Sequence, residues 1–151
     1  HYLKFDKNWD DQSQSALYLM GSVADGPDQV VKKYRAGSGT GTDACTRFVG
    51  WLPDGKYQVE FHRKDFNGSL IKGYAIKVSD MRCANGTLRD ELFVHSEMTS
   101  SGGQGSAEGF RWDGPKDYES AGCIKLQPAD IKNLFATADS KGWPTSLTVV
   151  S

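Results

Sequence analysis

Cys123 is the residue of this sequence whose setting most favours covalent chemistry. It lies in the segment SAGCIKL, directly after Gly122 and a few residues before Pro128, where a helix can begin. A glycine allows backbone N–H groups to approach a ligand closely, and a nearby helix N-terminus lowers the pKa of a thiol. Cys123 is therefore either a reactive nucleophile with a lowered pKa or a small buried side chain.

A cysteine nucleophile needs a base, and two histidines are candidates. His62 lies on the polar face of an expected strand beside Gln58 and Glu60, where an exposed imidazole without a role is expected. His95 ends the apolar segment ELFVHSE just before an irregular Gly-rich stretch, a common position for catalytic groups. From the residues alone, a catalytic Cys123–His95 pair and an inert, buried pair both stay open.

The other two cysteines, Cys45 and Cys83, lie in the polar segments TDACT and MRCANG, which are typical of loops. Their spacing lacks the paired Cys-x(2–4)-Cys pattern of structural zinc sites, so no metal site is expected. A disulfide between them would close a long loop and add about 4 kcal/mol of stability. Two unpaired thiols are the alternative, whereas a disulfide indicates an oxidising compartment and a secreted protein.

The composition argues against several classes of partner. The 151 residues have the length of a single domain, 1–151, and carry a net charge of −1 with 25% charged residues. This balance gives no electrostatic reason to expect nucleic acid as a partner. No apolar run approaches the roughly 18 residues of a membrane span, so no membrane insertion is expected.

The apolar pattern is mainly that of β-strands. Asp25-Gly26 and Asn67-Gly68 are each flanked by apolar runs, which is the sequence signal of a hairpin. The expected strands are therefore two hairpins over 15–37 and 55–80, followed by single strands over 91–97 and 146–151.

One segment, 128–139, has helical periodicity, with Ile131, Leu134 and Phe135 on one face. The stretch 99–118 is rich in Gly and Ser and has no periodicity. A loop of that length inside a compact domain is usually functional or disordered.

The segments FVHSE, SAGCIKL and PADIKNLF, in this order, resemble the catalytic domain of the L,D-transpeptidase (YkuD-type) family. The family pattern is a His, a spacer, and Ser/Thr-His-Gly-Cys with an apolar residue and Arg or Asn after it. The hairpin and small-residue segment 17–41 and the turn and strand GWLPDGKYQVEF also resemble the family, so the resemblance runs from about residue 16 onward. It implies a β-sandwich of mixed sheets with one main α-helix after the nucleophile.

The resemblance also implies a role for individual residues. Cys123 would be the nucleophile, His95 the imidazole that activates it, and Ser96 the residue that orients His95. Backbone N–H groups of Ala121, Gly122 and Cys123 would form the oxyanion hole. The expected substrate contacts are Ser120, Lys125, Trp112 and Tyr118, although aromatic residues in the 99–118 stretch could instead only anchor that loop.

The sequence departs from the family pattern at three places. Ala121 stands where the motif has its second His, which removes any help from that imidazole. Lys125 replaces the Arg and keeps its charge without the bidentate fork. The spacer between His95 and Cys123 is longer than usual, and the extra length is interpreted as an enlarged lid or rim over the cleft.

The function implied by the resemblance is transfer of an acyl group from a peptidoglycan stem tetrapeptide. D-Ala would be released and a diamino-acid amine would take the acyl group, giving a 3→3 cross-link. An L,D-carboxypeptidase or endopeptidase with the same Cys/His pair, and a non-catalytic wall-binding module, are the alternatives. The expected protein is a monomer outside the membrane, secreted or in the cell wall, and requires neither metal nor organic cofactor.

Overall fold

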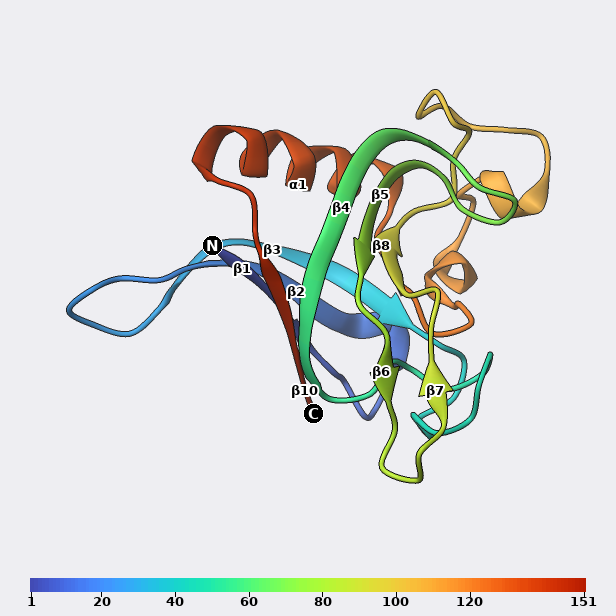
Figure 1. The fold of residues 1–151 in the computed structure, drawn as a ribbon. Helices are drawn as coiled ribbons and strands as arrows, with labels where there is room; N and C mark the ends of the chain where they lie inside the picture. Colours follow the sequence, from blue (N-terminus) through green and yellow to red (C-terminus); the bar gives the residue numbers. More distant parts are fainter.

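The two hairpins expected from the sequence are confirmed as the most extensive strand pairs of the fold (Figure 1). The structure, a computed structural model, describes residues 1–151. Its strands are β1 Tyr2–Asp6, β2 Ser15–Gly21, β3 Gln29–Ser38, β4 Gly55–Asn67, β5 Lys72–Val78, β6 Met81–Arg82, β7 Leu88–Arg89, β8 Phe93–His95, β9 Ile124–Lys125 and β10 Ser146–Val150. Its helices are α1 Pro128–Lys141 and the short 3-10 turns η1 Gln12–Gln14, η2 Glu108–Phe110 and η3 Pro115–Tyr118.

Eight of the ten strands form two mixed sheets, as expected for this fold class, and β6 and β7 form a small separate sheet. The order β1-β10-β4-β5-β8-β9-β3-β2 closes on itself, with β1–β10 and β8–β9 as the parallel pairs. The closure comes from two long strands: β3 pairs first with β2 and then with β9, and β4 pairs first with β10 and then with β5. A mainly β fold with one main helix is thus confirmed, and its two sheets are joined at both edges.

The core lies inside this closed sheet and under α1. The helix begins at Pro128, as predicted, and Ile131, Leu134 and Phe135 are fully buried. Phe135 contacts Tyr74 of β5 edge to face, with 4.9 Å between the ring centroids. The apolar face read from the helical periodicity is therefore the face that packs on the sheet.

Strand β1 was not expected from the sequence, although its pattern was available. Leu3 and Phe5 alternate with Tyr2 and Lys4, and both apolar side chains are fully buried. The strand pairs with β2 and β10 and so connects the two ends of the chain within one sheet. It lies upstream of the segment that resembles the transpeptidase family.

The disulfide between Cys45 and Cys83 is confirmed, with 5.3 Å between the Cα atoms. It ties the loop that follows β3 to the small β6–β7 sheet, and it spans 38 residues of sequence. Cys123 is the single free cysteine and is buried. None of the helices combines the length and the apolar character that crossing a membrane requires.

Candidate active site

Cys123 and His95 line the same cavity, which has a volume of about 520 Å³. His95 ends β8, and Cys123 directly precedes β9, which runs parallel to β8 with His95 opposite Lys125. Residues two apart on a strand share a face, so this register places Cys123 and His95 on the same side of the sheet. The topology thus brings together two residues that are 28 positions apart in the sequence.

The thiol of Cys123 is buried and protonated at neutral pH. Burial raises its pKa to about 11, against the opposing effect of the Phe93 backbone N–H, which lies 3.4 Å from Sγ. The thiol also lies 3.4 Å from the carbonyl oxygen of Glu91, which accepts its proton in a hydrogen bond. The expected lowering of the pKa by the helix is wrong, because β9 separates Cys123 from the start of α1 at Pro128.

The imidazole of His95 is neutral and oriented. Its Nδ1 lies 2.8 Å from the carbonyl oxygen of Ser96, which can only accept, so Nδ1 carries the proton and Nε2 is an acceptor. Burial, and then the nearby Lys125 ammonium, lower the pKa of His95 to about 3. His95 makes no hydrogen bond to Cys123 in this structure, whose own partners are Glu91 and Phe93.

The loop before Cys123 is held by the hydroxyl of Ser120. This hydroxyl donates to the Cys123 carbonyl oxygen at 2.6 Å and accepts from the N–H groups of Gly39 and Gly122 at 2.9 and 3.1 Å. The hydroxyl of Ser120 is thus occupied by the loop itself, and its expected contact with substrate stays a prediction. One of the three expected oxyanion donors, the Gly122 N–H, is also engaged within the loop.

Arg89 is a buried residue of the site that the sequence did not indicate. Its guanidinium donates to four backbone carbonyl oxygens, at distances between 2.6 and 3.2 Å. Three acceptors belong to the loop that follows β3 and carries Cys45, here called the disulfide loop, and one belongs to the Cys123 loop: Ala44, Gly50, Trp51 and Ala121. A Cβ at Gly122 would overlap this guanidinium, so the glycine before the cysteine makes room for Arg89.

Two residues that line the cavity, Phe48 and Glu91, are the only non-glycine residues with positive φ, at 67° and 53°. Such a backbone conformation is uncommon outside glycine and persists only where the surrounding structure imposes it. The carbonyl of Glu91 contacts the Cys123 thiol, and Phe48 extends into solvent with 68% of its surface exposed. Strained backbone therefore concentrates at this cavity, as it does at functional sites.

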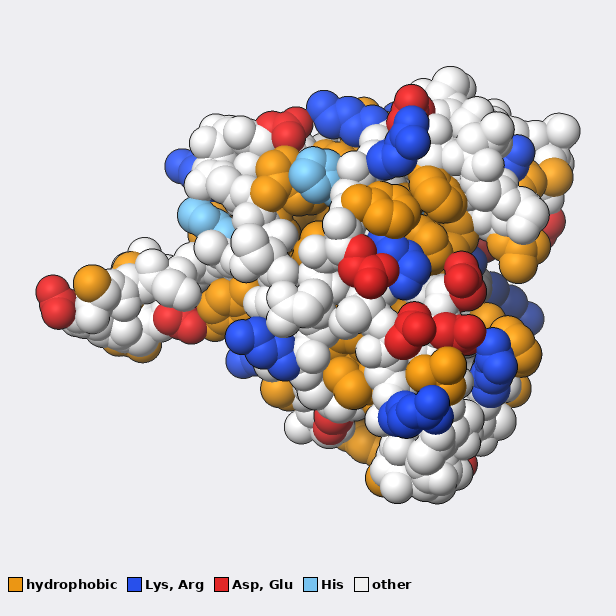
Figure 2. Space-filling model, viewed as in Figure 1, with side chains coloured by type: hydrophobic (Ala, Val, Ile, Leu, Met, Phe, Trp, Pro, Cys, Tyr) orange, Lys and Arg blue, Asp and Glu red, His pale blue; other side chains and the backbone are white.

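Apolar residues at the end of β4 and in the turn that follows it line the cavity, and the sequence did not single them out. They are Phe66, Leu70 and Ile71, and Leu70 is 83% exposed. Figure 2 shows hydrophobic side chains gathered on the face over β4, β5 and β8. The signal available in the sequence was the pair Leu70-Ile71, one residue after the Asn67-Gly68 turn, where polar residues are usual.

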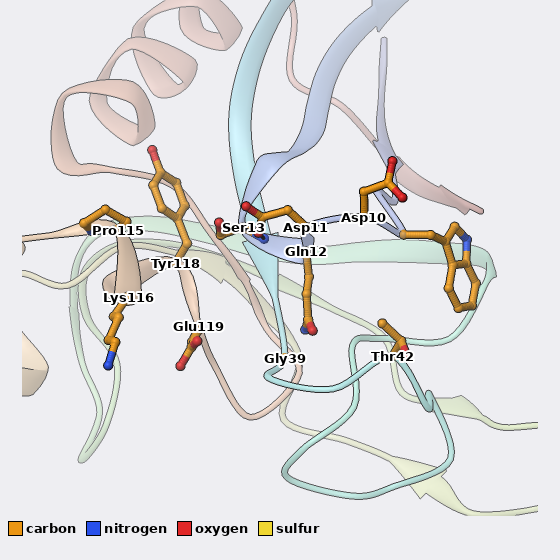
Figure 3. A pocket seen from close by; sticks show the side chains of 11 residues that line it. Asp10, Asp11, Gln12, Ser13, Gly39, Thr42, Pro115, Lys116, Tyr118 and Glu119 are labelled. Atoms are coloured by element: carbon orange, nitrogen blue, oxygen red, sulfur yellow. Dashed lines mark hydrogen bonds between the residues drawn. The ribbon is translucent and has the colours of Figure 1, made fainter.

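The 99–118 segment does not line this cavity, so its interpretation as a lid over the cleft is wrong. Trp112 packs edge to face on Tyr118 with 4.7 Å between ring centroids, and neither residue reaches Cys123. Tyr118 lines a separate polar cavity of about 330 Å³ between η1 and η3 (Figure 3). The predicted substrate contacts of Trp112 and Tyr118 are thus not brought to the nucleophile, and the two aromatic rings anchor the loop.

Lys125 lies in the cavity wall, but its ammonium is paired. Its Nζ is 2.6 Å from Oε1 of Glu97, and both side chains are largely buried. Burial raises the pKa of Glu97 to about 7, with the Lys125 ammonium opposing that rise. Lys125 therefore reaches a substrate anion only by exchanging this partner.

Because the pKa of Cys123 is raised, the rate at which its thiol is alkylated should depend strongly on pH above neutrality. Because only the thiolate attacks iodoacetamide, alkylation of the folded protein is expected to accelerate about tenfold per pH unit from pH 7 to 10. Mass spectrometry of peptides from samples quenched over this range measures the rate at Cys123. A plateau near the ordinary thiol pKa of about 8.5 would contradict the prediction, and the urea-unfolded protein supplies that reference curve.

Comparisons with known proteins bear on the fold. No family model and no curated protein matches the sequence. The structure is similar to that of Bdellovibrio bacteriovorus Bd1075, with a TM-score of 0.62 and 17% sequence identity over 99% of this chain. The chain spans 47% of that protein, about half of its length. At this identity the similarity shows a shared fold alone.

Proposed function

We propose that the protein is a cysteine acyltransferase that acts on peptidoglycan stem peptides. The observation that carries the proposal is the shared cavity of Cys123 and His95, in which Nδ1 of His95 is held by Ser96 and Nε2 is left as an acceptor. A nucleophile, a base and a group that orients the base are the parts that thiol catalysis needs. The resemblance of SAGCIKL and its flanking segments to the L,D-transpeptidase family supports the substrate class.

In the first half-reaction, Nε2 of His95 takes the thiol proton while Sγ of Cys123 attacks the carbonyl carbon between the L-centre of the diamino acid and D-Ala. The C–N bond then breaks, and the proton on His95 passes to the D-Ala amine. A thioester on Cys123 remains. Both groups are neutral before substrate binds, because burial raises the pKa of the thiol and lowers that of the imidazole.

In the second half-reaction, the amine of a neighbouring stem peptide attacks the thioester and restores the thiol. The product is a 3→3 cross-link between two stems. If water attacks instead, the product is a tripeptide and the protein is an L,D-carboxypeptidase. Ala121, which stands in place of a motif histidine, removes a group that could influence this choice. Work on the cell wall takes place outside the cytoplasm, and the Cys45–Cys83 disulfide agrees with that location.

The experiment that tests the proposal is incubation of the protein with a disaccharide tetrapeptide, followed by mass analysis of the products. Dimers that have lost one D-Ala support the transferase, and tripeptide alone supports the carboxypeptidase. If neither forms, the proposed chemistry is wrong, and binding of the intact protein to insoluble peptidoglycan then tests the non-catalytic wall-binding module.

Replacement of His95 by Gln is expected to slow D-Ala release by about 10²–10⁴-fold, because the base that takes the thiol proton is removed. His62→Gln is the matched control, since His62 stacks on Trp143 with 3.4 Å between ring centroids and does not line the cavity. Initial rates of both variants are measured on the same tetrapeptide. Equal rates for the two variants would contradict the role of His95.

A further inference from the structure

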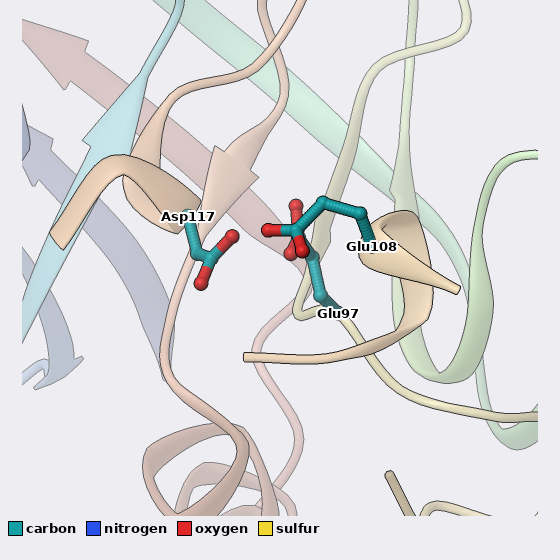
Figure 4. A group of neighbouring side chains, drawn as sticks. All are labelled: Glu97, Glu108 and Asp117. Carbon is teal, nitrogen blue, oxygen red and sulfur yellow. The ribbon is translucent and has the colours of Figure 1, made fainter. Parts of the chain in front are cut away.

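Three carboxyl groups meet where the 99–118 segment lies against the end of β8. Glu97 follows β8, Glu108 belongs to η2 and Asp117 to η3. Each can offer one oxygen such that all three oxygens lie within 4.8 Å of one another. Figure 4 shows the three groups pointing toward one another. None of them belongs to the Cys123 cavity.

Glu97 is the buried member of this cluster and has an oxygen without a partner. The residue is 8% exposed, and its Oε1 is bound by Lys125 at 2.6 Å. Its Oε2 is inaccessible to solvent and has no hydrogen-bond donor. A buried carboxylate oxygen without a partner is costly, so an oxygen in this position indicates a missing positive group.

The other two carboxyl groups are also fixed through one oxygen each. Oε2 of Glu108 pairs with Arg111 at 2.8 Å. Oδ2 of Asp117 accepts from the backbone N–H groups of Asp113 and Gly114, at 2.6 and 2.9 Å. Protein donors that hold one oxygen of a carboxylate and leave the second free are the usual support of a metal ligand.

The balance of charge and the kind of donor indicate the ion. Three carboxyl groups face two cations, Lys125 and Arg111, and Arg111 is shared with Asp113. The donor atoms are all oxygens, which suits a hard cation, and they come from irregular segments, which suits the variable geometry of calcium better than the strict octahedron of magnesium. We propose that Glu97, Glu108 and Asp117 bind a calcium ion that fastens the 99–118 segment to the end of β8.

The ion would add to the contacts that hold the 99–118 segment in place, among them the Gln104 side chain, which donates to the Glu97 carbonyl oxygen, and the Tyr118 ring, which packs on Arg35. The 99–118 segment contains only two 3-10 turns and no strand, yet it stays folded against the barrel. A cation bound by Glu97, by Glu108 of η2 and by Asp117 of η3 closes two loops at once. It thereby lowers the population of conformations in which the 99–118 segment is open. This role does not require the chemistry proposed for Cys123.

Calcium titration of the whole protein by calorimetry tests the proposal, with terbium luminescence sensitised by Trp112 and Tyr118 as the second probe. The expected result is a single site with a Kd of about 10⁻⁴–10⁻³ M, the range of extracellular calcium modules. Glu108→Gln is expected to weaken binding of both ions at least tenfold. Glu108 is exposed, and its ion pair with Arg111 contributes little stability, so the variant should fold.

Glu119→Gln is the matched control, because Glu119 is also an exposed glutamate of this region and is not one of the three ligands. Its affinity for calcium should equal that of the unmodified protein. Absence of binding up to about 10 mM calcium would overturn the proposal, as would equal affinity in Glu108→Gln. If Glu97 and Asp117 share a proton in place of the ion, calcium does not bind. Cys123→Ala should bind calcium normally, which separates this test from that of the catalytic proposal.

Discussion

Cys123→Ala is expected to abolish release of D-Ala from a disaccharide tetrapeptide, with a loss of at least about 10³-fold in rate. The variant lacks the sulfur that forms the acyl bond, and its charged neighbours do not substitute for it: His95 is a neutral acceptor and the Lys125 ammonium is paired with Glu97. The serine hydroxyls that line the cavity are far weaker nucleophiles than a thiolate. Liquid chromatography with mass detection of D-Ala and of the remaining peptide measures the loss. The second cavity, around Tyr118, contains no cysteine or histidine.

The fold of this variant provides the necessary control. Cys123 is not paired, so the Cys45–Cys83 disulfide and the barrel should be retained, which the circular dichroism and melting temperature report. A carbapenem should add its mass to the unmodified protein and not to Cys123→Ala, which locates the acyl bond. Turnover that survives the substitution in a folded protein would place the chemistry elsewhere.

The parts of the fold that the sequence predicts are those set by local pattern. Asp25-Gly26 and Asn67-Gly68 lie between two apolar runs each, and both turns are where the structure has hairpins. The spacing of apolar residues after Pro128 defines the buried face of α1. These signals depend on neighbours within a few positions, so tertiary contacts had little opportunity to override them.

The walls of the candidate site depend instead on contacts between distant segments. Phe48 reaches the cavity because a disulfide closes its loop, and Leu70 reaches it because β5 pairs with β8. The 99–118 segment was long and followed His95, which made a lid plausible, but the turns η2 and η3 direct it away from Cys123. Local residue patterns do not predict which segments line the cavity, because that depends on the order of the strands around the barrel.

Arg89 is the clearest case of a residue that only the structure reveals, since in the sequence LRDE reads as an ordinary polar turn. Its side chain is almost fully buried, 1% exposed, and connects the disulfide loop to the Cys123 loop through backbone carbonyl oxygens. A planar guanidinium can serve acceptors in several directions at once, which a single ammonium cannot. Arg89 is therefore a positioning residue for the loop that carries the nucleophile.

Arg89→Met is expected to lower the free energy of unfolding by about 3 kcal/mol, because four carbonyl oxygens, two of them in buried and two in part-buried hydrogen bonds, lose their donor. Urea unfolding with the disulfide intact measures this loss. The freed Ala121 carbonyl should also loosen the Cys123 loop, so alkylation of Cys123 at a fixed pH becomes faster in the folded variant. Arg63→Met, which removes an exposed ion pair with Asp65, should change stability by less than about 1 kcal/mol and leave the alkylation rate unaltered.

The two readouts separate support of the fold from support of the site. A residue that only fills space would lower stability and leave the reactivity of Cys123 in the folded state unchanged. Arg89→Lys keeps the charge and part of the volume but has one ammonium for four acceptors, so it should recover stability only in part and leave the thiol more reactive than in the parent. An Arg89→Met variant as stable and as slow to alkylate as Arg63→Met would show that the four carbonyl oxygens find other donors. In that case the disulfide loop and the nucleophile loop would be coupled by something other than Arg89.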